Sequence, residues 1–228
     1  HVTGVQTCAL PISRYRTNAL RGKVSVAASY TVLGYFLPDL LARFRASYPE
    51  VEIDLRDMDR TEIEQAVLDK EVDLGVAILS NIHKLERFAH AVLVRSRRQL
   101  WVAPGHALAK IASPSLKDIA QHPYIMVTTD EAELSTLGYW KSRRIKPNIV
   151  FRTTSIEAVR GLVAHGFGVT VLSDMVFRPW SLEGKRIEAR PILDLVPPME
   201  VGALWNPEKE LSTPAEAFQQ FLLHAYGY

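Results

Sequence analysis

Residues 22–51 read GKVSVAASYTVLGYFLPDLLARFRASYPEV, and this stretch decides the fold. Val24, Val26 and Ala28 alternate with small or polar residues, which is the pattern of a strand with one buried face. Apolar residues then return at helical spacing, between Leu33 and Phe44. The stretch therefore predicts a strand that leads through a short polar loop into an amphipathic helix.

The polar loop between this strand and this helix consists of Ser29, Tyr30 and Thr31. Backbone N–H groups in the first turn of a helix have no partner within the helix, and the helix dipole is positive there. Such a turn attracts a carboxylate or a similar anion, and the two hydroxyls add donors. The alternative is that Ser29 and Thr31 only cap the helix.

Strand and helix signals alternate along most of the chain, which indicates an α/β fold with largely parallel strands. Capping-box spacing at Thr61–Glu64 and Thr154–Glu157 predicts two further helix starts, each after an extended segment. Apolar strands are expected at 98–104 and 198–206, and a final helix at about 213–224. Gly166 and Gly168 are expected to end the helix that precedes the strand at 169–172.

The composition is that of a globular protein. Apolar residues make up 47% of the chain, and 27 basic residues oppose 25 acidic ones. No apolar run is long enough to span a bilayer. The seven histidines include no pair at metal-ligand spacing on one helix face, and neither a Gly-x-Ser-x-Gly elbow nor a phosphate-binding glycine loop occurs. We therefore expect no enzyme, no metal site and no cofactor.

Several motifs occur in a fixed order along the chain. They are Phe36–Phe44 with Tyr48–Val51, the strand entry Lys70–Ala77, the turn Gly105–Ala109, and the segment Leu162–Leu172. Together they resemble the effector-binding domain of LysR-type transcriptional regulators, over about residues 21–223. Ala107 and Ser173 stand where that family usually has proline.

The resemblance implies a type 2 periplasmic-binding-protein fold, in which two Rossmann-like subdomains are joined by two crossover strands. Residues 22–102 and 204–228 would form subdomain I, and residues 103–203 would form subdomain II. The ligand of this fold lies in the cleft between the subdomains. Strand ends and helix N-termini face that cleft, which is where a ligand is expected on physical grounds as well.

The candidate ligand-binding residues follow strands that end at this cleft. They are Ser29, Tyr30, Thr31, Arg60, Thr128, Thr129, Thr153 and Thr154. Arg60 could hold a carboxylate in a bidentate fork. Alternatively, its neighbours Asp57 and Asp59 could hold it in a structural ion pair.

The resemblance also implies a function. The domain would bind a small effector, in the favoured case a carboxylate, and would thereby control the arrangement of DNA-binding domains. It would form a homodimer or homotetramer through residues 34–47 and 51–56, would act in the cytoplasm, and would contact DNA only through a winged helix-turn-helix ahead of it. The alternatives are a solute-binding protein of a transporter and, as a third reading, an enzyme on the same scaffold.

The first residues do not fit this reading. Residues 2–12 match the in-frame translation of a common sequencing-adapter oligonucleotide, so we expect residues 1–12 to be an artefact and residues 13–21 to be a remnant of the linker ahead of the domain. The single cysteine, Cys8, then carries no chemistry. The rest of the chain contains no cysteine, which excludes disulfides and thiolate metal sites.

Overall fold

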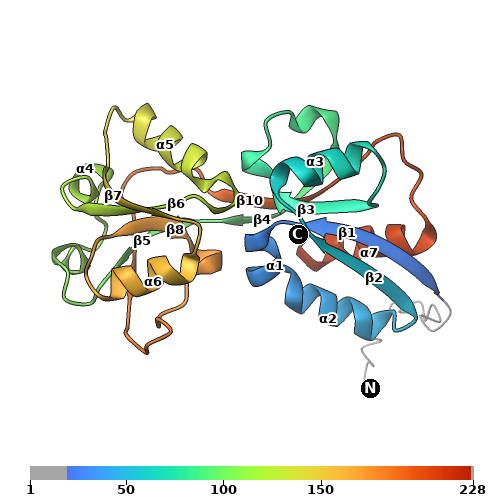
Figure 1. The fold of residues 1–228 in the computed structure, drawn as a ribbon, viewed down its shortest axis with the longest axis horizontal. Helices are drawn as coiled ribbons and strands as arrows, with labels where there is room; N and C mark the ends of the chain where they lie inside the picture. The colour runs from blue at the N-terminus through green and yellow to red at the C-terminus, as the bar shows by residue number, and fades with distance from the viewer. Residues whose placement is uncertain (1–19, 227–228) are drawn as a thin grey trace, which may run out of the picture.

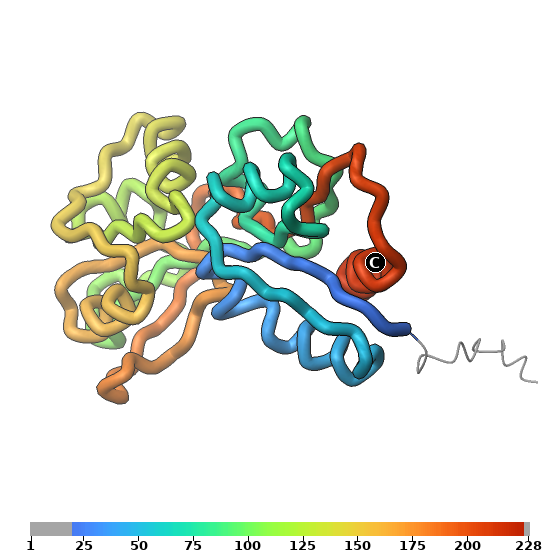
Figure 2. Tube along the Cα trace, turned by 45° about the vertical axis from the view of Figure 1, so that its right-hand side comes forward, coloured from blue at the N-terminus to red at the C-terminus, as the bar shows by residue number. Residues whose placement is uncertain are grey.

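The computed structural model describes residues 20–226, which form two α/β lobes side by side (Figures 1 and 2). Residues 1–12, and residues 13–21 apart from Leu20 and Arg21, lie outside this range, so the artefact and the linker remnant stay predictions. No helix within the described range is long and apolar enough to cross a bilayer.

The first lobe contains a five-stranded sheet in the order β2-β1-β3-β10-β4. Its strands are β1 (Gly22–Ala28), β2 (Val51–Asp57), β3 (Leu74–Ile78), β4 (Ala89–Ser96) and β10 (Met199–Trp205). β1 runs parallel to both β2 and β3, whereas β10 is antiparallel to β3 and to β4. This sheet begins with the strand and helix that the opening stretch predicts.

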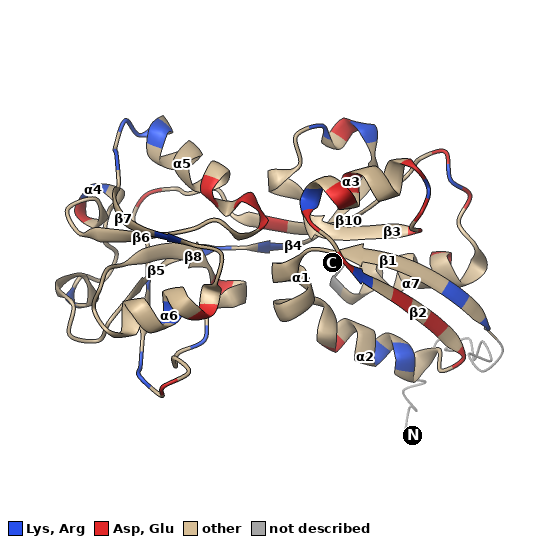
Figure 3. Ribbon diagram, viewed as in Figure 1, with Lys and Arg blue, Asp and Glu red and all other residues tan. Residues whose placement is uncertain are grey.

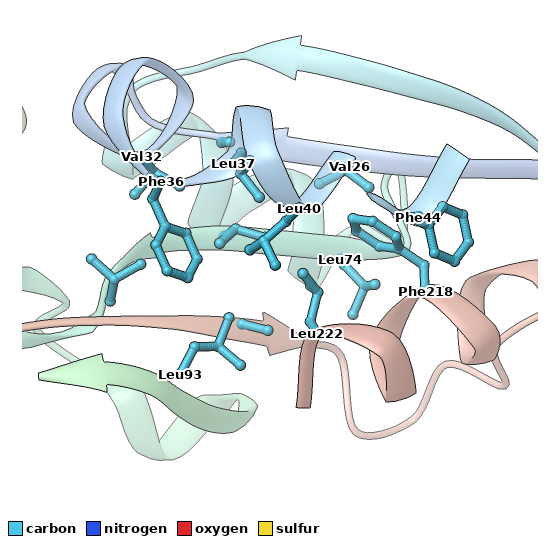
Figure 4. Packing of buried hydrophobic residues seen from close by; sticks show 14 of the residues in the cluster. Val26, Val32, Phe36, Leu37, Leu40, Phe44, Leu74, Leu93, Phe218 and Leu222 are labelled. Carbon is cyan, nitrogen blue, oxygen red and sulfur yellow. The ribbon is translucent and has the colours of Figure 1, made fainter. Parts of the chain in front are cut away.

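Helices cover both faces of the first sheet. They are α1 (Tyr30–Tyr35), α2 (Leu37–Ser47), α3 (Arg60–Leu68) and α7 (Thr213–Tyr226). Because successive side chains of a strand alternate between faces, Val26 packs with α2 and α7, while Ala27 packs with α3 on the opposite face. Figure 4 shows Phe44 of α2 beside Phe218 of α7, whose rings meet edge to face with centroids 4.8 Å apart.

The second lobe contains a three-stranded sheet, β8-β5-β9, and a parallel pair, β6-β7. Its strands are β5 (Arg98–Val102), β6 (Pro123–Val127), β7 (Asn148–Thr153), β8 (Thr170–Ser173) and β9 (Glu188–Pro191). A bridge between Tyr124 and Val169 joins β6 to the chain entering β8. At Gly168 any Cβ atom would lie 2.7 Å from the carbonyl oxygen of Pro123, so this close approach requires glycine.

Helices cover both faces of this lobe too. They are α4 (Leu116–Ile119), α5 (Ala132–Ser142) and α6 (Ile156–Ala164). Trp140 of α5 is buried on one face, and Val159 of α6 is buried on the other. Gly166, with a φ of +78°, lies between α6 and β8, as predicted.

The strand pairing differs from the subdomain ranges that we predicted. β5 pairs in the second sheet, although the predicted range 22–102 places it in the first lobe. β10 pairs in the first sheet, although most of it falls in the range 103–203 that we predicted for subdomain II. Arg97, between β4 and β5, is where the chain crosses, and it returns between β9 and β10. Apolar content alone did not reveal which sheet each strand joins.

Candidate functional site

Two cavities lie between the lobes, and residues of both lobes line each of them. The outer cavity has a volume of about 560 Å³ and is lined by Tyr30, Asp59, Arg60, Thr128, Thr129, Asp130, Glu131, Thr154 and Ser155. The inner cavity measures about 30 Å³, which is close to the volume that one water molecule occupies in the liquid. It is lined by Thr31, Ile78, Asn81, Arg98, Val127, Thr129, Ala132, Ser135, Ile156, Leu172, Ser173, Val176 and Met199.

Six of the eight predicted site residues line these cavities. Tyr30, Arg60, Thr128 and Thr154 line the outer one, Thr31 lines the inner one, and Thr129 lines both. The structure therefore brings together most of the residues that the sequence suggested, from segments about a hundred positions apart.

Ser29 and Thr153 line neither cavity. Ser29 is the N-cap of α1, but its side chain makes no capping hydrogen bond, and its buried hydroxyl has no partner among residues 20–226. Thr153 Oγ1 accepts a hydrogen bond of 3.1 Å from the backbone N–H of Ser155. Thr153 thus has a local structural contact that the sequence reading did not anticipate.

The two predicted capping boxes are each displaced along the chain. The N-cap of α3 is Asp59 rather than Thr61, and its side chain and that of Glu62 satisfy each other's backbone N–H groups. The N-cap of α6 is Ser155 rather than Thr154. Each helix begins within a few residues of the end of the preceding strand, β2 or β7. The last residue with extended backbone before the helix is its N-cap.

A carboxylate of the protein itself occupies the position that we assigned to an anionic ligand. The backbone N–H of Thr31 donates a hydrogen bond of 2.9 Å to Asp130 Oδ2. Asn81 Nδ2 donates a hydrogen bond of 2.6 Å to the backbone oxygen of Asp130. Thr31 and Asn81 belong to the first lobe and Asp130 to the second, so these bonds close the cleft.

Arg60 is in an ion-pair network, but not with the aspartates named as alternatives. Its Nε contacts Glu131 of the second lobe, and its Nη1 contacts Glu64 one turn along α3. Burial lowers the pKa of Arg60, and the two carboxylates more than offset this, so its pKa is raised. Two of the three guanidinium nitrogens, Nε and Nη1, are therefore already engaged by carboxylates.

The opposite side of the cleft is closed by Tyr35 of α1. Its hydroxyl donates to Glu157 Oε1 at 3.3 Å and accepts from Arg160 Nη2 at 3.5 Å, both on α6. Arg160 is 2% exposed, forms an ion pair with Glu157, and also donates to the backbone oxygen of Val176. The guanidinium of Arg178 lies over the ring of Tyr35, 5.2 Å from its centroid.

Acidic groups predominate around the outer cavity. Asp59, Asp130 and Glu131 line it, and Arg60 is the single basic residue of its lining. Figure 3 shows acidic positions on α3 and at the ends of α5 and α6 that face the first lobe. Within residues 20–226, no group of three or more histidine, cysteine, aspartate or glutamate side chains has the arrangement of a metal site.

The sequence matches the LysR substrate binding domain family over residues 17–227. The chain belongs to this family. The fold is accordingly that of type 2 periplasmic-binding proteins, as predicted, and the arrangement of two lobes around a cleft is the one in which that fold binds its ligands.

Individual relatives agree. The chain is 28% identical over 160 residues to the HTH-type transcriptional regulator CysB of Haemophilus influenzae, a match that covers 70% of this chain and 49% of CysB. It superposes on HinK, a LysR family transcriptional regulator from Pseudomonas aeruginosa, with a TM-score of 0.82, 28% identity, and coverage of 91% of this chain and 71% of HinK. The effector binding domain of QuiR in complex with shikimate gives a TM-score of 0.77 at 18% identity, with 91% of this chain and 98% of that one covered.

These relatives favour the regulator reading over a transport protein. The chain spans about half the length of CysB and about two thirds of YwbI, a regulator of Bacillus subtilis. It corresponds to the ligand-sensing part of such proteins. The relatives named here are transcriptional regulators rather than enzymes.

Proposed function

We propose that this domain senses a small carboxylate effector in the cleft between its lobes and thereby controls transcription by the full-length protein. The observation that carries the proposal is the cleft itself, in which six predicted residues and the Thr31 N–H converge from both lobes. A ligand that contacts both lobes stabilises one relative arrangement over the other by its differential affinity. The arrangement of the lobes would then set the transcriptional response. The full-length protein would act in the cytoplasm.

A carboxylate is the effector class that the donors of the cleft fit best. The Thr31 N–H already binds a carboxylate oxygen, that of Asp130, so its geometry suits this group. Thr128 and Thr154 add hydroxyls to the lining of the outer cavity, whereas the hydroxyl of Thr129 already donates to the backbone oxygen of Thr154. Shikimate, the ligand in the QuiR structure, is itself a carboxylate.

Oligomerisation would transmit the change in lobe arrangement. We propose a homodimer in which α2 and β2 of one subunit meet the second lobe of its partner. β2 is an edge strand, and a groove of about 500 Å³ lined by Pro38, Leu41, Val51, Ile53 and Leu55 runs beside it. On the second lobe, Val150 and Phe151 of the edge strand β7 are 50% and 52% exposed. Exposed apolar side chains on two edge strands are typical of association surfaces.

DNA would be bound through a winged helix-turn-helix ahead of this domain, in a dimer or a tetramer of the full-length protein. Movement of the cleft would change the spacing of the two DNA-binding heads. The effector would act as a ligand only, with no cofactor and no chemical conversion.

A thermal-shift screen of the chain against small aromatic and aliphatic carboxylates tests the ligand proposal. A ligand that binds only the folded state raises the melting temperature as its concentration rises. Thr129→Val keeps the shape of a residue that lines both cavities and removes its hydroxyl, whereas Thr213→Val makes the same change at the far start of α7. We expect the shift to be reduced by Thr129→Val and retained in Thr213→Val. A shift that is equal in both variants would place the ligand outside the cleft.

A further inference from the structure

The carboxylate of Asp130 binds the first lobe at the position where the effector is proposed to bind. Asp130 Oδ2 accepts from the Thr31 N–H at 2.9 Å, and its backbone oxygen accepts from Asn81 Nδ2 at 2.6 Å. Its neighbour Glu131 forms an ion pair with Arg60. Two consecutive acidic residues of the second lobe thus make three contacts with the first.

The backbone of these two residues is held in an unfavourable conformation. Asp130 has a φ of +52° and Glu131 a φ of +54°, in the left-handed region. Such backbone costs free energy for residues other than glycine, and a pair in succession persists only where surrounding contacts fix it. Within the second lobe, the backbone N–H of Ala132 closes the turn onto Thr129 and the Thr129 hydroxyl donates to the backbone oxygen of Thr154. The contacts with Thr31, Asn81 and Arg60 hold the same turn from across the cleft.

The inner cavity of the cleft has no room for an effector, whereas the outer cavity, of about 560 Å³, is large enough for a small ligand. The inner cavity of about 30 Å³ holds about one water molecule, whereas ligand sites usually measure hundreds of cubic ångströms. Arg60, the single basic residue of the outer lining, is already paired with Glu131 and with Glu64. An anionic ligand that enters the outer cavity therefore meets three acidic side chains and an arginine that is already paired.

We propose that Asp130 and Glu131 form an internal latch, in which the Asp130 carboxylate stands in for the effector and keeps the ligand-free cleft closed. This inference rests on the proposed function in one respect, that the ligand is a carboxylate. The effector then competes with Asp130 for the Thr31 N–H. The affinity of the domain is set by that exchange and is lower than its open cleft would allow.

The latch can be broken at Asp130 without adding strain. Asp130→Gly removes the carboxylate, and glycine adopts a left-handed φ more readily than aspartate does. If the backbone conformation alone closed the cleft, this variant would close it at least as well. Asp130→Asn tolerates the same backbone and keeps an oxygen acceptor, but it removes the negative charge. Glu133→Ala is the matched control, because Glu133 pairs with Arg152 within the second lobe.

The distance between the lobes is the readout, and it needs no ligand. Spin labels at Glu86 and Lys141, one exposed position on each lobe, are introduced in a chain whose Cys8 is replaced by serine, and the labelled protein is diluted with unlabelled chain. We expect the open-to-closed ratio to rise about ten- to hundredfold in Asp130→Gly, the change expected for a lost hydrogen bond to a charged group. Asp130→Asn should fall between Asp130→Gly and the parent, and Glu133→Ala should match the parent.

The outcomes separate the latch from the proposed effector class. An unchanged distance distribution in Asp130→Gly would overturn the latch, whatever the effector is. If Asp130→Gly opens the cleft and binds benzoate more tightly than the parent, both inferences hold. If it opens the cleft but binds neither benzoate nor acetate more tightly, the competition between effector and Asp130 is overturned, and the carboxylate class of the proposed function fails with it while the closing contact stands.

Discussion

At the mouth of the cleft the lobes meet through carboxylates on left-handed backbone, whereas at Tyr35 they meet through a buried arginine on a regular helix. The Arg60 and Glu131 side chains are 15% and 32% exposed, whereas Arg160 is 2% exposed and its ion-pair partner Glu157 is 36% exposed. Water screens ion pairs more strongly as they become exposed. Arg160 differs from Arg60 in being buried and in donating to the backbone oxygen of Val176 within its own lobe, so we expect the mouth to open first and the Tyr35 side to act as the hinge.

The largest expected effect is at the hinge side. Arg160→Ala removes the ion pair with Glu157, the hydrogen bond to Val176 and the packing over the Trp101 ring, whose centroid lies 5.9 Å from the guanidinium. We expect the free energy of unfolding to fall by about 3 kcal/mol, as for other broken buried pairs. Urea denaturation measures it, with Arg186→Ala, at an exposed position of the same lobe, as the control. A loss below about 1 kcal/mol would remove the contrast between the two sides.

The hydrogen bond between Asn81 and Asp130 at the mouth is expected to contribute less to the free energy of unfolding, but a measurable amount. Asn81→Ala removes the donor to the Asp130 backbone oxygen and leaves that oxygen without this partner. We expect a loss of about 2 kcal/mol in the same denaturation experiment, because this part-buried acceptor loses its hydrogen-bond partner. If Asn81→Ala cost as much as Arg160→Ala, the contact at the mouth would contribute no less to stability than the contacts of Arg160, and the expected order would be contradicted.

A smaller change in stability is expected at the start of α3, where Arg60 pairs with Glu131 across the cleft. Asp59→Ala removes the capping box that fixes the first turn of α3, which should cost about 1 kcal/mol. Thr61→Ala changes the residue at which the sequence had placed the cap, and should cost less than half as much. Equal losses in the two variants, measured by thermal denaturation, would contradict the position of the cap.

These capping residues illustrate what the sequence could and could not provide. Capping-box spacing located both helix starts to within about two residues, because a polar residue that follows an extended segment can cap the first turn of a helix. It did not select Asp59 over Thr61, since both residues cap helices and the choice depends on where β2 releases the chain. The motif order likewise identified the two-lobe fold but not which sheet β5 joins.

The latch residues could not have been predicted in the same way. Asp130 and Glu131 lie in a 3₁₀ turn, Thr129–Glu131, without apolar periodicity. A left-handed φ is foreseeable for glycine but not for two acids whose conformation depends on contacts with the opposite lobe. The two predicted threonines that precede them, Thr128 and Thr129, were found because they follow a strand directly.

The smallest expected effect concerns pH at the hinge side. Burial raises the pKa of Tyr35, and the net shift remains upward although Arg160 opposes it. The unfolded chain therefore ionises first, so stability from this group is complete below about pH 10 and is lost as the pH rises through the folded pKa. We expect Tyr35→Phe to cost about 0.5 kcal/mol near neutral pH. The difference from the parent should shrink or reverse above pH 10, and a constant difference would contradict the burial of this hydroxyl.

The competition between the effector and Asp130 is tested most directly by calorimetric titration of benzoate into the parent chain and into Asp130→Gly. Removal of the internal carboxylate frees the Thr31 N–H. We predict that the dissociation constant falls at least about tenfold in Asp130→Gly, and that Glu133→Ala leaves it unchanged. Equal dissociation constants in the parent and in Asp130→Gly would show that the ligand and Asp130 do not share a site, and would contradict the account.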